Sequence, residues 1–157
     1  MAYVNADGLE ILAAGDAGTA AKRGTSLSSQ KKALVMTITG TDLGSSADTP
    51  QDHDAFIPAG SYITGAHLIV TTAFTSGGSA TLTIGTYQQD GTTVDADGID
   101  ATIALAALAA NKGVACDGAA VGGTATVGAN DVYIEANYGT AAFTAGEAKL
   151  VVEYIEP

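Results

Sequence analysis

The clearest strand pattern in the chain lies between Phe56 and Tyr87, which reads FIPAGSYITGAHLIVTTAFTSGGSATLTIGTY. It opens on Pro58-Ala59-Gly60, a turn signal, because proline presets φ at the second turn position and glycine accepts a positive φ. Two apolar runs follow, 61–74 and 79–87, and the residues between them include Ser76-Gly77-Gly78. The two runs and the glycine turn between them predict two antiparallel strands joined as a hairpin.

The first of these strands carries apolar groups on both faces. Ala66, Leu68 and Val70 share one face by the two-residue period, and His67 and Ile69 share the other. We therefore expect the strand to be covered on both sides. Because exposed apolar surface on a sheet needs a partner, His67 and Ile69 are the candidate self-interface with a second copy of the chain.

Three more strands are predicted on either side of this central region, at 32–39, 131–138 and 147–155. In the last two, apolar and polar residues alternate, so each is expected to have one dry face and one wet face. The polar stretch 40–54 is expected to be a long exposed loop.

The segment between Gln88 and Val127 is expected to be less regular. Residues 88–100 predict a polar loop, and 99–111 the one helix, with Asp100 as its cap and Lys112-Gly113 at its end. The Ile and Leu content of 99–111 would also suit a strand. The glycine-rich run 118–127 predicts an irregular strand or crossover.

Short strands separated by Gly, Pro and Asp loops predict an all-β fold: an antiparallel β-sandwich, jelly-roll-like, with at most one short helix. With 157 residues, the chain suits a single domain. We expect that β-sandwich domain to span 31–157 and an N-terminal arm to span 1–30, either loosely ordered or docking on a neighbour. Within the arm, 8–14 predicts one helical turn or a short strand.

The formal net charge of −11 is carried almost entirely by the chain beyond residue 32. An acidic body argues against binding nucleic acid, which requires neutralised phosphates, and against anionic membranes. The first residues do not resemble a targeting signal, and the chain has no stretch of about 20 apolar residues. We therefore predict no nucleic-acid partner and no membrane partner.

Little in the sequence suggests catalysis. His53 lies between two aspartates, as an acid/base pair would require, but adjacency in sequence rarely gives the geometry, so a solvated loop histidine is expected. The one cysteine, Cys116, excludes an intrachain disulfide and fits a reducing compartment. Because Asp117 would oppose a thiolate, Cys116 is expected to be a small buried or loop residue. We predict no catalytic residue, no cofactor and no enzymatic activity.

One acidic run is the best candidate for calcium, because hard cations prefer several carboxylate oxygens held by a turn. It lacks the spacing of an EF-hand loop, so a plain acidic loop is favoured over a metal site. Zinc is not indicated, since no Cys/His pair has zinc spacing. The candidate calcium residues are Asp90, Asp95, Asp97 and Asp100.

Three stretches resemble small structural proteins of tailed bacteriophages: 57–74, 79–86 and 143–154, the last reading FTAGEAKLVVEY. The resemblance covers about residues 55–155. It implies a virion component with a β-sandwich fold and no catalytic residues, most often a capsid decoration protein.

From this resemblance we expect a decoration protein that binds and stabilises the phage head. The implied partners are the major capsid protein and further copies of the chain, as a homotrimer. The implied location is the capsid surface of the virion, after synthesis in the cytoplasm of the bacterial host. An alternative is a receptor- or glycan-binding module of a head or tail fibre, against which the absence of Trp counts. A small hydrolase using His53 or the acidic run is the third possibility.

Overall fold

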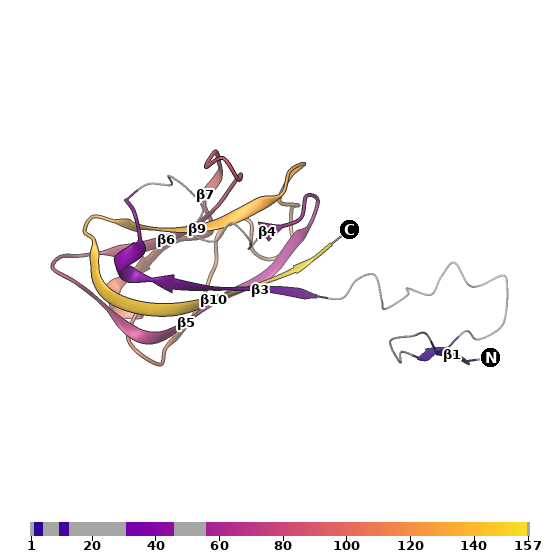
Figure 1. The fold of residues 1–157 in the computed structure, drawn as a ribbon, viewed down its shortest axis with the longest axis horizontal. Coiled ribbons are helices and arrows are strands. Elements are labelled where there is room, and N and C mark those ends of the chain that lie inside the picture. Colours follow the sequence, from indigo (N-terminus) through magenta and orange to yellow (C-terminus); the bar gives the residue numbers. More distant parts are fainter. Residues whose placement is uncertain (1, 5–9, 13–30, 46–55, 157) are drawn as a thin grey trace.

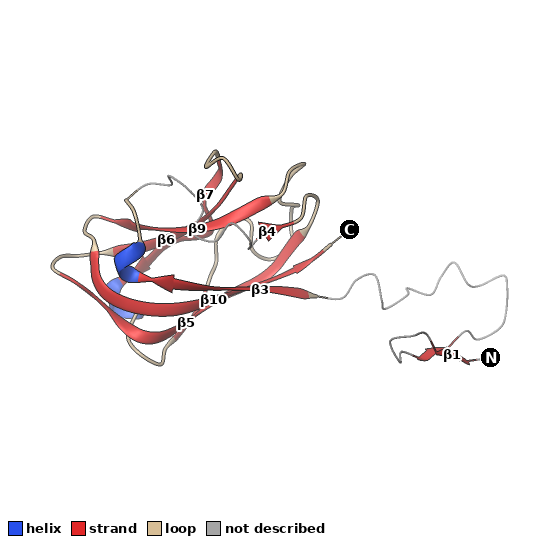
Figure 2. Ribbon diagram, in the orientation of Figure 1, coloured by secondary structure: helices blue, strands red, loops and turns tan. Residues whose placement is uncertain are grey.

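The computed structural model in Figure 1 describes residues 2–4, 10–12, 31–45 and 56–156. Strands dominate these residues, and the helical elements among them are two single 3₁₀ turns (Figure 2). No helix among the described residues is long and apolar enough to cross a membrane. The elements are β1 (Ala2–Val4), β2 (Glu10–Leu12), β3 (Lys32–Thr39), η2 (Gly40–Asp42), β4 (Phe56–Ile57), β5 (Tyr62–Ser76), β6 (Thr81–Tyr87), β7 (Thr93–Ala104), η3 (Leu105–Ala107), β8 (Gly113–Ala115), β9 (Val132–Gly139) and β10 (Phe143–Ile155).

Eight of these strands form two four-stranded sheets. The first sheet has the order β3-β10-β5-β8 and the second β4-β9-β6-β7, and the pairs within both are antiparallel. From β3 to β10, every connection between successive strands switches sheets except the one from β6 to β7, which is the arrangement of an eight-stranded jelly roll. The predicted all-β antiparallel sandwich is confirmed. Strands β1 and β2 pair with each other, so 10–12 is a short strand.

The predicted hairpin at 56–87 is wrong, although both of its strands exist. Strand β5 belongs to the first sheet and β6 to the second, so Gly77-Gly78 carries the chain from one sheet across to the other. Two consecutive strands with one buried face each can pair side by side or face each other across a core. Their alternation of apolar and polar residues is the same in both cases.

The turn before β5 is as expected, with Gly60 at φ 76° and the Ser61 N–H donating to the Pro58 carbonyl at 3.1 Å.

The predicted polar loop at 88–100 and helix at 99–111 are also wrong. Only the start of that loop is a turn, and β7 then runs from Thr93 to Ala104 before the single turn η3. Ile99 and Ile103 are buried in the core from this strand. The β-branched residues at 93, 94, 99, 102 and 103 favour the extended backbone, and this preference prevails over the helix signals. Residues 118–127 form turns and isolated bridges, in line with a crossover.

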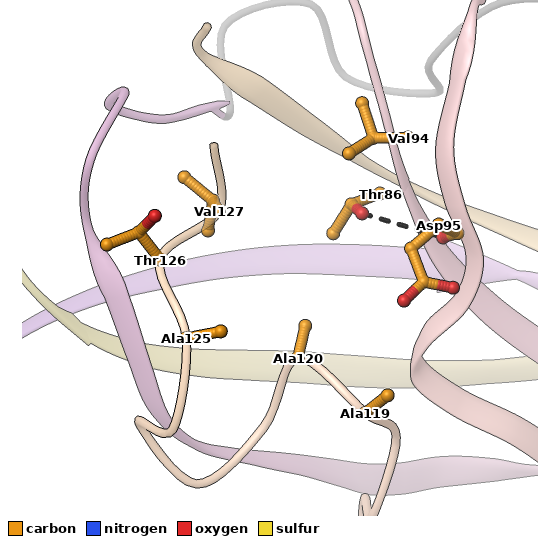
Figure 3. Close-up of a pocket in the computed structure, with 8 residues that line it drawn as sticks. All are labelled: Thr86, Val94, Asp95, Ala119, Ala120, Ala125, Thr126 and Val127. Atoms are coloured by element: carbon orange, nitrogen blue, oxygen red, sulfur yellow. Dashed lines mark hydrogen bonds between the residues drawn. The ribbon is translucent and has the colours of Figure 1, made fainter. Parts of the chain in front are cut away.

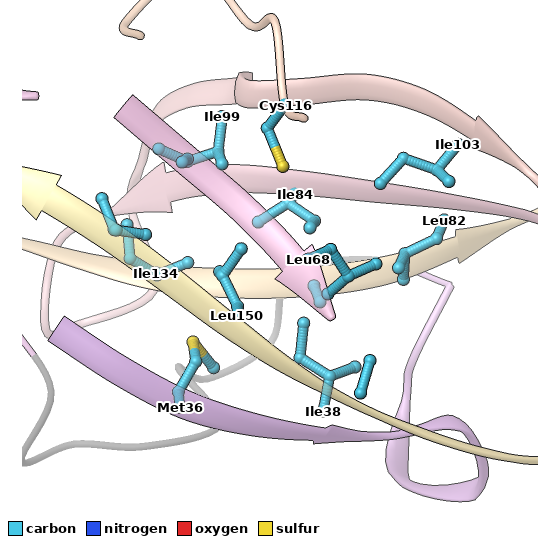
Figure 4. Packing of buried hydrophobic residues seen from close by; sticks show 14 of the residues in the cluster. Met36, Ile38, Leu68, Leu82, Ile84, Ile99, Ile103, Cys116, Ile134 and Leu150 are labelled. Carbon is cyan, nitrogen blue, oxygen red and sulfur yellow. The ribbon is translucent and has the colours of Figure 1, made fainter. Parts of the chain in front are cut away.

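The core lies between the two sheets (Figure 4). Leu68 and Leu150 from the first sheet meet Leu82 and Ile84 from the second, and all four are fully buried. Phe74 and Phe143 pack edge to face at one end, with ring centroids 5.1 Å apart. Strand β3 has the bounds that the sequence predicts, and β10 has the predicted dry face with Leu150 and Val152 inward.

The expected wet face of β9 is instead buried, since Tyr133, Glu135 and Asn137 are all less than one-tenth exposed. The first half of β7 folds over this side of the second sheet. A Cβ on Gly85 would overlap the Ala96 carbonyl, and the Tyr87 hydroxyl donates to that same carbonyl at 3.5 Å. Glycine at 85 therefore allows the close approach that covers this face.

Candidate interaction surface

The first sheet has one open face, and the strand register fixes which residues share it. Val35 on β3 and His67 on β5 both lie opposite Val151 of the central strand β10. One step along, Lys149 lies between Thr37 and Ile69 in the same way. Strand β8 extends the first row, because Ala115 lies opposite His67. We call this surface the outer stripe; its members are Val35, His67, Ile69, Ala115, Lys149 and Val151.

The outer stripe exposes large apolar side chains, which a sheet face in contact only with water usually lacks. Val35 is 58% exposed and Ile69 48%, whereas their strand neighbours Leu34, Leu68 and Val70 point into the core. Within this chain, no described element covers the stripe, so the second face of β5 is open. The structure places His67 and Ile69, the predicted self-interface residues, next to each other on this face. Grouped exposed apolar side chains on a flat sheet mark a surface suited to binding another molecule.

Lys149 is the charged member of the outer stripe. The ion pairs among the described residues join Lys31 to Glu153 at 2.9 Å and Lys32 to Glu156 at 2.6 Å, and neither involves Lys149. The Lys31 ammonium holds the pKa of Glu153 below its usual value. Glu147 accepts a hydrogen bond from the Thr71 hydroxyl at 3.0 Å. The acids of β10 are thus engaged within the chain, which leaves the Lys149 ammonium free for an outside anion.

The buried cysteine is unsuited to nucleophilic chemistry. Cys116 is 6% exposed, and burial raises its pKa to about 12, with the charges of Asp100 and Asp117 adding to the effect. A thiol with such a pKa holds its proton at neutral pH, whereas a catalytic cysteine needs a lowered one. His53 lies outside the described residues.

The four aspartates considered for calcium are spread along the β6–β7 turn and β7. Asp90 accepts a bond from the Thr92 N–H in the turn, which lowers its pKa, and Asp100 is buried near Cys116. Asp95 and Asp97 interact with each other. Among the described residues, no group of three His, Cys, Asp or Glu side chains is placed to hold a metal ion.

A cavity of about 220 Å³ lies between β7 and the crossover segment 118–127 (Figure 3). Its walls are mostly methyl groups, and its polar side chains are Thr86, Thr126 and the carboxylate of Asp95. The Thr86 hydroxyl donates to the backbone carbonyl of Asp95 at 3.5 Å. Among the described residues, no aromatic side chain lines the cavity, so these residues provide no stacking surface of the kind on which sugar rings are usually held. The lining residues are Thr86, Val94, Asp95, Ala119, Ala120, Ala125, Thr126 and Val127.

Two solved structures contain chains that resemble this one over most of its length. A chain in the capsid of Ralstonia phage GP4 is 15% identical with a TM-score of 0.56, and the match covers 82% of this chain and 85% of that one. A chain in the capsid asymmetric unit of Cyanophage Pam1 is 19% identical with a TM-score of 0.55, and the match covers 93% and 100%. Both are chains of phage capsids. At these identities the likeness shows a shared fold, the fold that the phage-like motifs predict. No family model matches the chain, and no curated protein matches it.

Sequence reasoning identified two members of the outer stripe and missed its centre. The residues it did not single out are Val35, Ala115, Lys149 and Val151. The signal for Val35 was present, because an apolar residue between the inward Leu34 and Met36 must point outward on a strand. Lys149 could not be recognised, since its isolation from acids depends on where Glu147 and Glu153 find their partners.

Proposed function

We propose that this protein is a non-enzymatic capsid decoration protein that binds and stabilises a phage head as a homotrimer. The observation that carries the proposal is the open outer stripe on a jelly roll whose fold is shared with chains of two phage capsids. A protein whose task is attachment needs a stable core and uncovered contact surfaces, and it needs no reactive group. The partners are the major capsid protein and other copies of the chain, and the site of action is the capsid surface.

Attachment by several weak contacts suits such a protein. A trimer presents each contact three times, and linked contacts give an avidity that exceeds the affinity of any single one. Local three-fold positions on a shell match a three-fold protein in symmetry. We assign shell attachment to the N-terminal arm, 1–30, and self-contact to the outer stripe, with residues 31–157 as the sandwich domain that carries both.

A receptor- or glycan-binding module is the weaker candidate. Among the exposed large apolar residues, Phe56 is 41% and Tyr62 39% exposed, but they lie on different sheets. Tyr133 is buried and packs against Phe56, with ring centroids 6.0 Å apart. No pair of aromatic rings therefore forms an open platform in the described part of the chain.

The proposal is tested by attachment to shells that lack this protein. Purified protein is mixed with such shells, and the bound fraction after sedimentation is measured across a concentration series. We expect saturable binding and a raised melting temperature of the shell, because a ligand that binds the intact shell stabilises it. Ile69→Asp weakens binding by about tenfold or more, because loss of the trimer removes avidity. Ala101→Asp, an exposed change on the second sheet, binds like the wild type. Absence of shell binding together with saturable sugar binding would favour the glycan-binding module.

A further inference from the structure

The edge strands of the two sheets differ in how well their free edges are protected. The edges are β3 and β8 in the first sheet and β4 and β7 in the second. Strand β4 is two residues long and is followed by Pro58, and β8 is three residues long. The edge of β7 is covered, because the Gly118 and Ala120 N–H groups donate to the carbonyls of Ile99 and Gly98. Short strands, proline and covering segments are the usual means by which proteins prevent further strand pairing.

Strand β3 has none of these protections. It is eight residues long and contains no proline. It pairs with β10 without a bulge, from Lys32 opposite Tyr154 to Thr39 opposite Glu147, and is the indigo arrow beside the yellow β10 in Figure 1. Among the described residues, no backbone hydrogen bond reaches its other side. Strand β3 therefore presents a regular row of unpaired N–H and C=O groups, to which one further strand can bind.

The charges at the two ends of β3 favour a second copy of β3 as that strand. Lys31 and Lys32 lie at its beginning and Asp42 follows its end in η2, whereas 33–39 carries no charge. An antiparallel copy places the lysines of one chain level with Asp42 of the other, whereas a parallel copy places like charges side by side. Both lysine side chains are more than half exposed in the ion pairs that they form within the chain.

The uncharged run fixes how the two copies of β3 align. Residues 33–39 pair with themselves along their whole length when Met36 of one chain lies opposite Met36 of the other. Opposite residues in an antiparallel pair point to the same side of the sheet. In this register Leu34 lies opposite Ile38 of the second copy, so the inward side chains of both chains stay on the core side.

We propose that β3 of one copy pairs antiparallel with β3 of a second copy about a two-fold axis at Met36, which joins two first sheets into one. Ala33 then lies opposite Thr39 of the second copy, and Val35 opposite Thr37. Because both chains use the same edge, the contact ends at two copies. It uses the edge of the first sheet, whereas the proposed trimer uses the outer face. The contact therefore goes beyond the proposed function and links copies from neighbouring trimers on a shell.

Two cysteine variants of the full chain, Ala33→Cys and Thr39→Cys, test this register. Opposite residues of antiparallel strands have Cα atoms about 4.5–5.5 Å apart, within the range of a disulfide. Residue 33 of one copy lies roughly 20 Å along the strand from residue 33 of the other, beyond that range, and the same holds for residue 39. An equimolar mixture oxidised with copper phenanthroline is therefore expected to give about tenfold more cross-linked dimer than either variant alone, measured by non-reducing electrophoresis.

The controls separate this contact from other sources of cross-linking. The wild type measures any contribution of the buried Cys116, and circular dichroism checks that both variants fold. Ile69→Asp, added to both cysteine variants, disrupts the proposed trimer contact on the outer face. The mixture should still cross-link more than either variant alone, because Ile69 is not on β3.

Equal cross-linking of the mixture and the single variants would show random collision and overturn the proposal. So would a mixture that does not cross-link, or one whose cross-linking is lost with Ile69→Asp, since the contact would then depend on the outer stripe. Shell sedimentation of the wild type is read separately. A protein that binds shells but does not cross-link through β3 loses this contact and keeps the decoration role, and one that cross-links but does not bind shells loses only the decoration role.

Discussion

Asp100 is a carboxylate held almost entirely out of water, at 5% exposure. Burial raises its pKa, and the nearby charge of Asp117 raises it further, against the hydrogen bond from the Thr102 N–H. For an acid whose pKa is higher in the folded state than in the unfolded state, the stabilising contribution is complete below the unfolded value of about 3.9. It is lost as pH rises through the folded value, when the buried group must ionise.

Asp100→Asn is therefore expected to raise the melting temperature at pH 7 and to change it much less at pH 3.5. The amide keeps an oxygen that can accept the Thr102 N–H, which Asp100 accepts at 3.1 Å, and it never ionises. Thermal unfolding of both proteins at the two pH values measures the difference. Asp42→Asn, at an exposed position, serves as control and should leave both values unchanged. An equal gain at both pH values would mean that ionisation of Asp100 is not the cause.

At the scale of the elements, the position of a strand in its sheet should set the cost of a cavity. Leu150 is fully buried on β10, which has neighbours on both sides, whereas Leu34 lies 9% exposed on the edge strand β3. Leu→Ala changes in cores cost about 2–5 kcal/mol, more where the surroundings cannot relax. We expect Leu150→Ala near the upper end of this range and Leu34→Ala near the lower end, measured by urea unfolding. Equal losses would show that the edge is packed as rigidly as the centre.

The same elements show what alternation in a sequence can predict and where it stops. Lys32–Thr39 was predicted with its correct bounds, because inward Leu34, Met36 and Ile38 alternate with outward residues. The placement of β5 and β6 in different sheets was not predicted. Two strands that face each other across a core show the same alternation of apolar and polar residues as two strands paired within one sheet. The outer stripe was predicted in part, because the sequence pointed to His67 and Ile69 as interface residues. Strand β7 was not predicted, because 88–100 was expected to be a loop and 99–111 a helix.

At the scale of the whole molecule, the described strands of the proposed N-terminal arm, β1 and β2, do not join the sheets of the sandwich. The buried core of the described residues begins at Leu34, and β1 and β2 pair with each other and with no strand of either sheet. Lys31 is the first described residue of the sandwich region to bond to it, through Glu153. A chain that starts at Lys31 therefore retains every described contact that holds the two sheets together.

Deletion of 1–30 is accordingly expected to leave the unfolding transition unchanged and to abolish attachment to shells. The arm contains Lys22 and Arg23, two of the six basic residues of an otherwise acidic chain, so its loss makes the remaining protein less able to approach an acidic neighbour. Calorimetry of the truncated chain measures the first expectation, and sedimentation with shells measures the second. Light scattering then separates two causes of lost attachment. A truncated chain that still forms the proposed trimer but no longer attaches places shell contact in the arm. A truncated chain that no longer forms the trimer would place self-contact there. Attachment that survives the deletion would mean that the sandwich itself binds the shell.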